Sequence, residues 1–283
     1  MSKYPLLKAQ LLEKKLIGSQ DLMSPEPIGM QMLELVHTRE YLDKLTASAL
    51  SAAEIRRLGL PWSEALWRRS LLAASGTLLA GRTALREGIA ANLAGGTHHA
   101  FADHGEGFCV LNDVALALTV LRAEGAIRRA VVIDLDVHQG NGTAAIFEHA
   151  HEVFTFSMHG ARNYPTAKMR SSLDVPLRDG IDDAEYLDLL ATHLPSVLDR
   201  SLPEVAFYLA GVDVVAGDRY GRLALSESGL AQRERFVIEA VRGRGIPLAI
   251  VLAGGYAPTR QRTAELHTHV FRAATEFESR LPR

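Results

Sequence analysis

Cysteine and long apolar runs are the two features that this sequence most plainly lacks. The 283 residues include one cysteine, Cys109, so no disulfide can form within the chain and we expect a reducing compartment. No apolar run approaches the ~20 residues that a membrane-spanning helix needs. The first ten residues have no apolar core followed by a cleavage site, which argues against a signal peptide. We therefore expect a cytoplasmic protein without membrane contact.

An excess of charge and any repetitive or linker-like segment are also missing. The net charge is -2 and the isoelectric point is near 6.6, which gives no support to direct nucleic-acid binding. No internal repeat, low-complexity tract or Pro/Gly/Ser-rich linker divides the chain. Hydrophobic residues make up 47% of the sequence, which is enough for a sizeable core. These features predict one large domain over residues 1–283.

The spacing of the apolar residues changes near residue 91. Before this point, helical spacing predicts helices over 40–52 and 63–86. After it, short apolar runs alternate with amphipathic stretches, as expected for strands buried on both faces of a parallel sheet between helices. The predicted strands are 91–94, 130–135, 153–157, 205–210 and 248–253, and the predicted helices are 111–124, 144–149, 184–200, 228–242 and 263–280. The chain is therefore assigned to the α/β class.

Each predicted strand is followed by ionisable or glycine-rich residues. In an open parallel sheet, ligands bind beyond the carboxyl ends of the strands, so residues at five strand ends can meet in one site. The motifs at these ends are GGTHH (95–99), DLDVH (134–138), SMH (157–159), GVD (211–213) and GGY (254–256). Their common position predicts an active site at this edge of the sheet.

Acidic and histidine residues after the second predicted strand have the spacing of a metal site. Asp134, Asp136 and His138 occupy alternate positions and so point to one face of an extended chain. With the distant Asp213, Asp136 and His138 would supply two carboxylates and one nitrogen, the three-ligand pattern of a catalytic zinc site. Iron or another divalent metal would suit the same ligands. The alternative is that the two aspartates cap the next helix and His138 only ends the strand.

Two further groups are candidates, one for acid–base chemistry and one for stabilising an oxyanion. His98 and His99 could divide proton transfer, one accepting a proton from the attacking water and one returning a proton to a leaving amine. Tandem histidines also occur as metal ligands or on surfaces. The hydroxyl of Tyr256 could donate to the oxyanion of an attacked amide. A packed aromatic residue is the alternative interpretation of an isolated Gly-Gly-Tyr.

Aromatic residues in two loops are candidates for the walls of a narrow channel. Gly107 and Phe108 follow the tandem histidines, and Tyr164 lies in the loop after the third predicted strand. Aromatic walls would fit a linear aliphatic chain such as a lysine stem, although core packing would explain either aromatic alone. Cys109 has no feature of a nucleophile and is interpreted as a small buried residue.

Five sequence blocks, in this order, resemble the signature blocks of the histone deacetylase family. They are GGTHH (95–99), GFCVLND (107–113), IDLDVHQGNG (133–142), AGVD (210–213) and AGGY (253–256). The resemblance extends from about residue 33 to the predicted C-terminal helix. The variant HQGNG (138–142), with AGDR (216–219) and Gly221 downstream, resembles the class IV branch and its bacterial relatives.

The resemblance implies a three-layer arginase/deacetylase fold, with a central, mostly parallel, eight-stranded sheet flanked by helices. It also implies roles for the site residues, which are the zinc ligands Asp136, His138 and Asp213, the acid–base pair His98 and His99, and the carbonyl-polarising Tyr256. Family members bind a potassium ion near the zinc, for which Asp134 and Ser157 are the candidates here. Asp134 would in addition orient His98.

Three departures from the family pattern bear on function. Many relatives have an aspartate where this chain has Asn141, and a neutral amide stabilises an imidazolium less than a carboxylate does, so we predict a less basic His99 than in those relatives. The acidic loop residue with which some relatives grip a peptide backbone is not found. Relatives usually have another strand before the segment that matches residues 5–12, so we expect a truncated start or a missing edge strand.

The sequence thus predicts a zinc-dependent deacylase that hydrolyses N-acetyl-lysine, lysine with a longer acyl chain, or a related acylated amine. The alternatives are an arginase-like hydrolase with two manganese ions and a non-catalytic module that binds acyl-lysine. Asn141 and Val215 stand where the first alternative needs further acids. The complete set of ligands and acid–base residues argues against the second. The sequence leaves open the metal bound in vivo, the acyl length, the natural amine and the oligomeric state.

Overall fold

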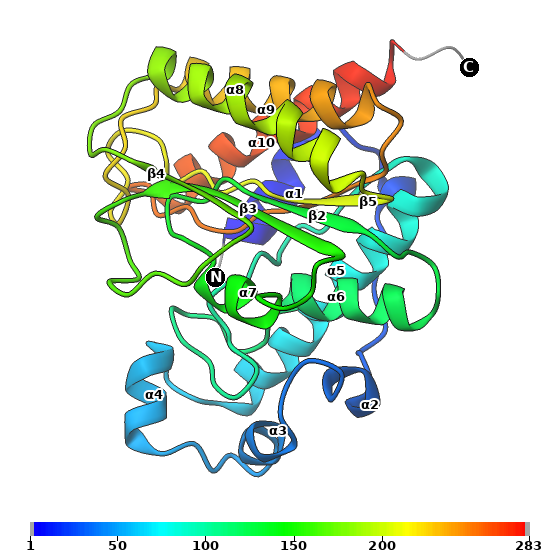
Figure 1. Ribbon diagram of the computed structural model, residues 1–283, viewed down its shortest axis with the longest axis vertical. Helices are drawn as coiled ribbons and strands as arrows, with labels where there is room; N and C mark the ends of the chain where they lie inside the picture. The colour runs from blue at the N-terminus through cyan, green and yellow to red at the C-terminus, as the bar shows by residue number, and fades with distance from the viewer. Residues whose placement is uncertain (1–2, 281–283) are drawn as a thin grey trace.

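The computed structural model describes residues 3–280, and its centre is a parallel sheet between two layers of helices (Figure 1). The strands are β1 (Ile89–Ala91), β2 (Ala130–Asp134), β3 (Val153–Gly160), β4 (Leu173–Leu177), β5 (Val205–Leu209) and β6 (Leu248–Val251). Their order in the sheet is β1-β6-β5-β2-β3-β4, and every neighbouring pair is parallel. The predicted three-layer α/β architecture is confirmed. The expectation of eight strands is wrong for the described residues, which form a sheet of six.

Helices cover both faces of this sheet. The α-helices are α1 (Lys3–Glu13), α2 (Met30–Leu33), α3 (Arg39–Thr46), α4 (Ala52–Leu58), α5 (Glu64–Glu87), α6 (Asp113–Ala123), α7 (Asn141–Ile146), α8 (Asp183–Ser201), α9 (Glu227–Arg242) and α10 (Arg260–Glu278), and Ser19–Asp21 is a short 3-10 helix. Helices α1, α8, α9 and α10 pack on one face, and α5 and α6 pack on the other (Figure 1). Among the described helices, none combines the length and the apolar character that a bilayer crossing requires.

Alternation along the central strands divides the core into these two layers. In β2, Val131 and Ile133 pack with the α8–α10 layer, whereas Val132 packs with the α5–α6 layer. All three side chains are buried because helices cover both sides of the strand. The sequence of such a strand is apolar at consecutive positions, which explains why the central runs show no clean alternation.

Several predicted elements have different bounds in the structure; the helix predicted over 144–149, for example, is α7 (Asn141–Ile146). The helix predicted over 40–52 ends at Thr46 as α3, and residues 47–51 separate it from α4, which was not predicted. Ser48 between them has a positive φ of 54°, and Ser51 starts α4 with a capping box that it forms with Glu54. The first strand, predicted over 91–94, is Ile89–Ala91. The residues after it form the loop that leads to the tandem histidines.

Strand β4 was not predicted from the sequence. It lies at the edge of the sheet, contains Pro176, and exposes part of its side chains. A short edge strand needs little apolar character, and proline is tolerated there because one side of the strand lacks a hydrogen-bonding partner. The segment therefore has no apolar run that would identify it.

The direction of the chain changes between β2 and β5. From β2 the chain proceeds to β3 and β4 on one side, whereas β5 returns to the other side of β2 and leads to β6. In parallel α/β sheets, such a switch opens a crevice beyond the carboxyl ends of the two strands. The ends of β2 and β5 are in register at Asp134 and Leu209, so the residues that follow them emerge side by side.

Candidate functional site

The end of β2 directs three polar side chains to one side. Leu135 and Val137 are fully buried in the α8–α10 layer of the core, so Asp134, Asp136 and His138, which alternate with them, point the other way. All three are also buried, with at most 8% of the residue exposed. The alternation that was predicted from the sequence therefore places three ionisable groups in the crevice.

Asp136 and His138 meet Asp213, which follows β5. Potential ligand atoms of the three residues all lie within 4.8 Å of one another. His138 Nδ1 is 2.9 Å from Asp136 Oδ1 and 3.3 Å from Asp213 Oδ2. Among the described residues, no hydrogen-bond partner reaches Asp213 Oδ2, although this atom is buried. An unpartnered carboxylate oxygen beside a second carboxylate and an imidazole fits a bound divalent cation.

The charges in this cluster point to the same conclusion. Burial, together with the nearby charge of Asp136, raises the pKa of Asp213 to about 6. Burial lowers the pKa of His138, but its hydrogen bond to Asp136 and the nearby carboxylate of Asp213 outweigh burial and raise it to about 10. A cluster that attracts a proton so strongly also attracts a divalent cation, which replaces the proton on binding.

Backbone groups hold the two carboxylates in place. Gly254 N donates to Asp136 Oδ2 at 2.6 Å, and Val137 N donates to Asp213 Oδ1 at 3.0 Å. A Cβ atom at position 254 would overlap both carboxylates, so only glycine permits this approach. The Gly-Gly segment after β6 therefore serves the cluster as well as the tyrosine that follows it.

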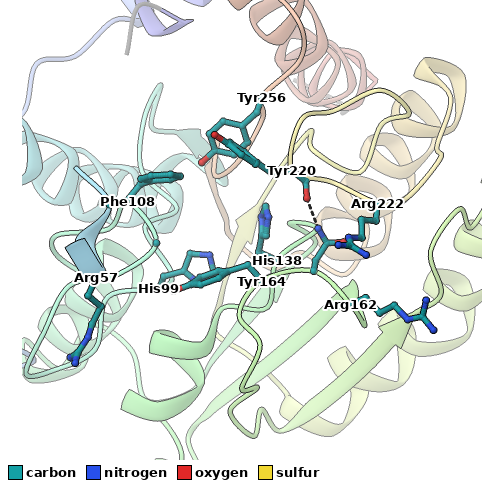
Figure 2. Close-up of a pocket in the computed structure, with 12 residues that line it drawn as sticks. Arg57, His99, Phe108, His138, Arg162, Tyr164, Tyr220, Arg222 and Tyr256 are labelled. Atoms are coloured by element: carbon teal, nitrogen blue, oxygen red, sulfur yellow. Dashed lines mark hydrogen bonds between the residues drawn. The ribbon is translucent and has the colours of Figure 1, made fainter. Parts of the chain in front are cut away.

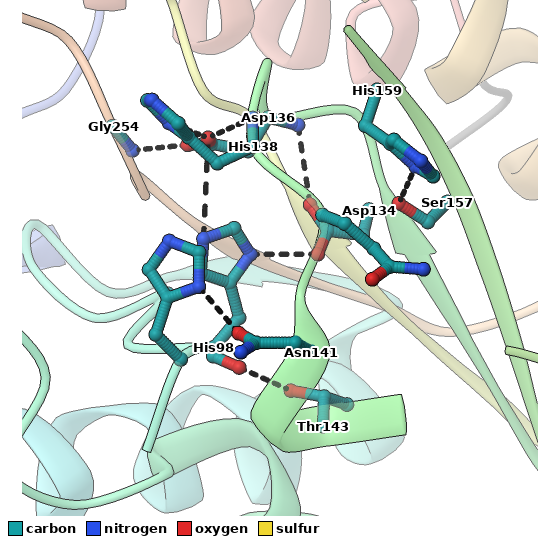
Figure 3. A network of polar contacts seen from close by, with 12 residues as sticks. His98, Asp134, Asp136, His138, Asn141, Thr143, Ser157, His159 and Gly254 are labelled. Carbon is teal, nitrogen blue, oxygen red and sulfur yellow. Dashed lines mark hydrogen bonds and ion pairs between the residues drawn. The ribbon is translucent and has the colours of Figure 1, made fainter. Parts of the chain in front are cut away.

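The tandem histidines lie beside the cluster, and their hydrogen-bond partners differ. Figure 3 shows His98 next to Asp134. His98 Nδ1 is 2.7 Å from Asp134 Oδ2, and His99 Nδ1 is 2.7 Å from Asn141 Oδ1. Burial lowers the pKa of His98, but the charge and hydrogen bond of Asp134 outweigh burial and raise it to about 9. Burial and the charge of His98 bring the pKa of His99 well below its usual value. One imidazole therefore favours the protonated form and the other the neutral form.

A cavity of about 370 Å³ leads to these residues (Figure 2). Its lining consists of Arg57, Gly59, His99, Gly107, Phe108, His138, Arg162, Asn163, Tyr164, Tyr220, Arg222 and Tyr256. Phe108 is 41% exposed and Tyr164 is 43% exposed, so neither is a core residue. A Cβ atom at Gly107 would overlap the ring of His99, which explains the glycine before Phe108. The predicted channel residues therefore line the same cavity as His99, His138 and Tyr256.

The two residues predicted to bind potassium lie outside the cavity described above. Asp134 and Ser157 line a small second cavity of about 10 Å³. Ser157 Oγ is also 2.9 Å from His159 Nδ1. Asp134 uses one oxygen for His98, and its other oxygen accepts a hydrogen bond from Asp136 N at 3.2 Å. The space is close to the volume that one water molecule needs.

Several residues of the site were missed by sequence reasoning. Glu106 contacts the Asn141 amide and the Tyr164 hydroxyl, and Tyr220 packs against Tyr256 with ring centroids 4.8 Å apart. The arginines at the rim of the cavity are Arg57, Arg162 and Arg222. All of these residues lie in loops or at a helix end, where no apolar period marks their direction. The position of Glu106 directly before the glycine and phenylalanine of the channel was the one available sign.

Comparisons with known proteins agree with this geometry. A family model described as "Histone deacetylase domain" matches residues 1–274. An uncharacterized protein of Picosynechococcus is 44% identical over 276 residues, which cover 98% of this chain and 92% of that protein. Histone deacetylase 2 of Arabidopsis thaliana is 32% identical and histone deacetylase RPD3 of Saccharomyces cerevisiae is 29% identical, over 84% and 85% of this chain. The matches span 64% and 59% of those two deacetylases, which are longer proteins.

Solved structures extend the comparison to the fold. The HD domain of HDA15 superposes with a TM-score of 0.82 at 23% identity, covering 98% of this chain and 84% of that chain. An HDAC homolog, solved in complex with SAHA, superposes with a TM-score of 0.81 at 26% identity, covering 96% of this chain and 77% of that chain. The three-layer architecture is therefore that of deacetylase domains. Since the family model covers nearly the whole sequence, the chain belongs to the histone deacetylase family.

Proposed function

We propose that this protein is a zinc-dependent deacylase that hydrolyses N-acetyl-lysine, lysine with a longer acyl chain, or a related acylated amine. The observation that carries the proposal is the meeting of the Asp136–His138–Asp213 cluster, His99 and Tyr256 at one cavity. Three protein ligands that leave a position free are typical of a catalytic zinc site. A bound zinc ion would supply Lewis-acid polarisation of the amide carbonyl and a lower pKa for water.

The protein's own residues would carry the proton transfers. His99, neutral and with one ring nitrogen free of the Asn141 contact, would accept a proton from the attacking water and pass it to the leaving amine. His98, paired with the Asp134 carboxylate, would remain protonated and stabilise the negative charge that develops on the reacting amide. The Tyr256 hydroxyl would donate a hydrogen bond to the oxyanion.

The walls of the cavity support a linear substrate. Phe108 and Tyr164 present aromatic surface at its mouth, and Gly107 leaves space beside His99. These walls would hold the methylene stem of an acylated lysine or amine by apolar contact. The substrate partner is therefore an acylated peptide, an acylated protein or an acetylated small amine.

We further propose a potassium site at Asp134 and Ser157. The small cavity between them has room for one ion or water, and a carboxylate with a hydroxyl suits a hard cation. A cation there would stabilise the Asp134 carboxylate, which in turn holds His98.

A substrate panel would test the function. Zinc-loaded protein should release the acyl group from acyl-lysine peptides or acetylpolyamines, and a chelator should abolish this turnover. Two manganese ions per chain would instead support an arginase-like hydrolase. Binding of acyl-lysine without turnover would support a non-catalytic module. Either result would contradict the proposal.

Two substitutions separate the roles of the site residues. Tyr256→Phe should keep the bound zinc and lower kcat by about 100- to 1000-fold, which is the usual effect of removing one oxyanion donor. Asp213→Ala should reduce the zinc content measured by atomic emission. Unchanged turnover of Tyr256→Phe would exclude the assigned donor role.

A further inference from the structure

The side chain of Asn141 lies between His99 and a carboxylate that the proposed mechanism does not use. Asn141 Oδ1 is 2.7 Å from His99 Nδ1, and Asn141 Nδ2 donates to Glu106 Oε1 at 2.6 Å. The same Glu106 oxygen accepts a hydrogen bond from the Tyr164 hydroxyl at 2.9 Å, and Glu106 Oε2 is 3.7 Å from His104 Nε2. Glu106 is thus connected both to the acid–base histidine and to the channel wall.

The carboxylate determines how the amide is oriented. An ionised carboxylate can only accept hydrogen bonds, so Asn141 has to turn its NH₂ group toward Glu106 and its oxygen toward His99. That oxygen in turn needs a donor. A neutral imidazole has one N–H, so the hydrogen of His99 has to be on Nδ1, and Nε2 keeps the lone pair.

Burial makes the opposite arrangement unfavourable. His99 is 5% exposed and Asn141 is 3% exposed, so water is poorly placed to replace a lost hydrogen bond at either group. If the amide were reversed, the Asn141 oxygen would face the Glu106 carboxylate, and neither group could donate. The nearby His104 ring and the hydrogen bonds from Asn141 and Tyr164 outweigh the effect of burial and keep the pKa of Glu106 below its usual value, so the carboxylate is ionised.

We propose that Glu106 is a positioning residue, which acts through Asn141 to hold His99 in the tautomer with the hydrogen on Nδ1 and the lone pair on Nε2. The Nε2 lone pair is the one that can accept a proton from water. The effect of Glu106 on turnover rests on the proposed function, whereas its effect on the tautomer does not.

The test compares wild-type protein with Glu106→Gln, which keeps the size of the side chain. A glutamine amide can donate as well as accept, so it allows both orientations of Asn141. Nitrogen-15 NMR of the histidine rings in zinc-loaded protein, with His99 assigned from a His99→Gln sample, reports which ring nitrogen carries the hydrogen. We expect the Nδ1–H form in the wild type and a mixture of tautomers in Glu106→Gln. The kcat should fall about two- to tenfold, in proportion to the productive fraction, with little change in KM.

A control and a rescue exclude general damage to the loop. Asp103→Asn makes the same chemical change at the outer end of the chain of contacts, where the exposed Asp103 is hydrogen-bonded to His104, and should leave the tautomer as in wild type. Adding Asn141→Asp to Glu106→Gln puts a carboxylate directly on His99 Nδ1. This double variant should restore the Nδ1–H form and most of the lost kcat.

The NMR measurement of the His99 tautomer tests the proposal independently of catalysis. If Glu106→Gln keeps a single Nδ1–H form, or if Asp103→Asn changes the tautomer equally, the proposal is overturned. Absence of deacylase activity in wild-type protein would contradict the proposed function, and the NMR comparison would still decide the role of Glu106.

Discussion

His98 and His99 are adjacent and equally buried, yet their protonation tendencies are opposite. The carboxylate of Asp134 raises the pKa of His98 to about 9 against the effect of burial. For His99, burial and the charge of His98 are larger causes than the hydrogen bond to Asn141, which raises the pKa too little to offset them. Asn141 therefore differs from an aspartate at this position mainly in lacking a negative charge. A lower basicity of His99 than in relatives that have an aspartate at this position stays a prediction.

A third buried histidine, His37, makes stability depend on pH. Its Nε2 atom accepts a hydrogen bond from Asn112 N at 3.1 Å, and burial lowers its pKa to about 4. The unfolded chain, with a histidine pKa near 6.5, then binds more protons than the folded chain between pH 6.5 and 4, so stability falls on acidification. From pH 7 to pH 5 this one group should cost about 2 kcal/mol of unfolding free energy.

Urea unfolding at the two pH values would measure this loss, with His37→Gln as the matched variant. A glutamine oxygen can still accept from Asn112 N but does not titrate. The wild type should lose about 2 kcal/mol more than His37→Gln between pH 7 and pH 5. Equal losses would show that the folded protein accommodates a charged His37.

The residues that sequence reasoning placed in the site lie at or after the end of an apolar strand, or match a family block. Asp136, His138 and Asp213 were expected together because parallel strands end at one edge, and the structure brings them within 4.8 Å. Glu106 could not be placed in this way. Its contacts depend on how the loop between β1 and α6 folds back on the start of α7, and no local pattern encodes such a path.

Among the helices and strands, those that bury many apolar side chains were predicted most accurately. Helices α5, α8, α9 and α10 and strands β2, β3, β5 and β6 contribute many buried apolar side chains, and each was found within a few residues of its actual bounds. Strand β4 and the break between α3 and α4 were missed because hydrogen bonds at an edge and a cap determine them. Such features leave little trace in apolar spacing. Helices α1, α2 and α4 were also missed, since each buries few apolar side chains.

A buried arginine of helix α9 is hydrogen-bonded to the backbone that follows β2. Arg233 is fully buried, Arg233 Nη1 donates to Leu135 O at 3.1 Å, and Arg233 Nη2 is 2.5 Å from Glu234 Oε1. The Tyr208 hydroxyl also donates to Glu234, at 2.7 Å. Leu135 lies between two site aspartates just after β2, so Arg233, which is paired with Glu234, stabilises the backbone that carries them.

Arg233→Met should therefore destabilise the protein by about 3–5 kcal/mol, because it leaves a buried carboxylate without its cation. The exposed neighbour provides the control, since Arg235→Met should change stability by less than about 0.5 kcal/mol. Replacing both partners, as in Arg233→Met with Glu234→Leu, should cost less than the single change at Arg233. Urea denaturation would measure all three variants, and equal stability of the two methionine variants would contradict the role of the pair.

For the whole molecule, a cation held by the cluster would couple metal binding to folding. Asp136 and His138 follow β2, Asp213 follows β5, and β3, β4 and α8 lie between them in the chain. An unfolded chain does not hold these ligands together, so a cation would bind the folded state far more strongly. Binding also relieves the juxtaposition of two buried carboxylates, of which Asp213 has an oxygen without a hydrogen-bond partner among the described residues.

Free zinc at 100 times its dissociation constant should add about 2.7 kcal/mol of stability, and chelation should remove it. For a protein of this size we expect a fall in Tm of about 4–5 °C, measured by calorimetry with and without chelator. Asp213→Asn keeps the shape of the side chain but removes a ligand charge, so its chelator-induced shift should be much smaller. Asp199→Asn, at a side chain that is 71% exposed, should keep the full shift. If Asp213→Asn responded to the chelator as the wild type does, the stabilising ion would have to bind elsewhere, because the same three ligands cannot hold it equally well with one charge removed.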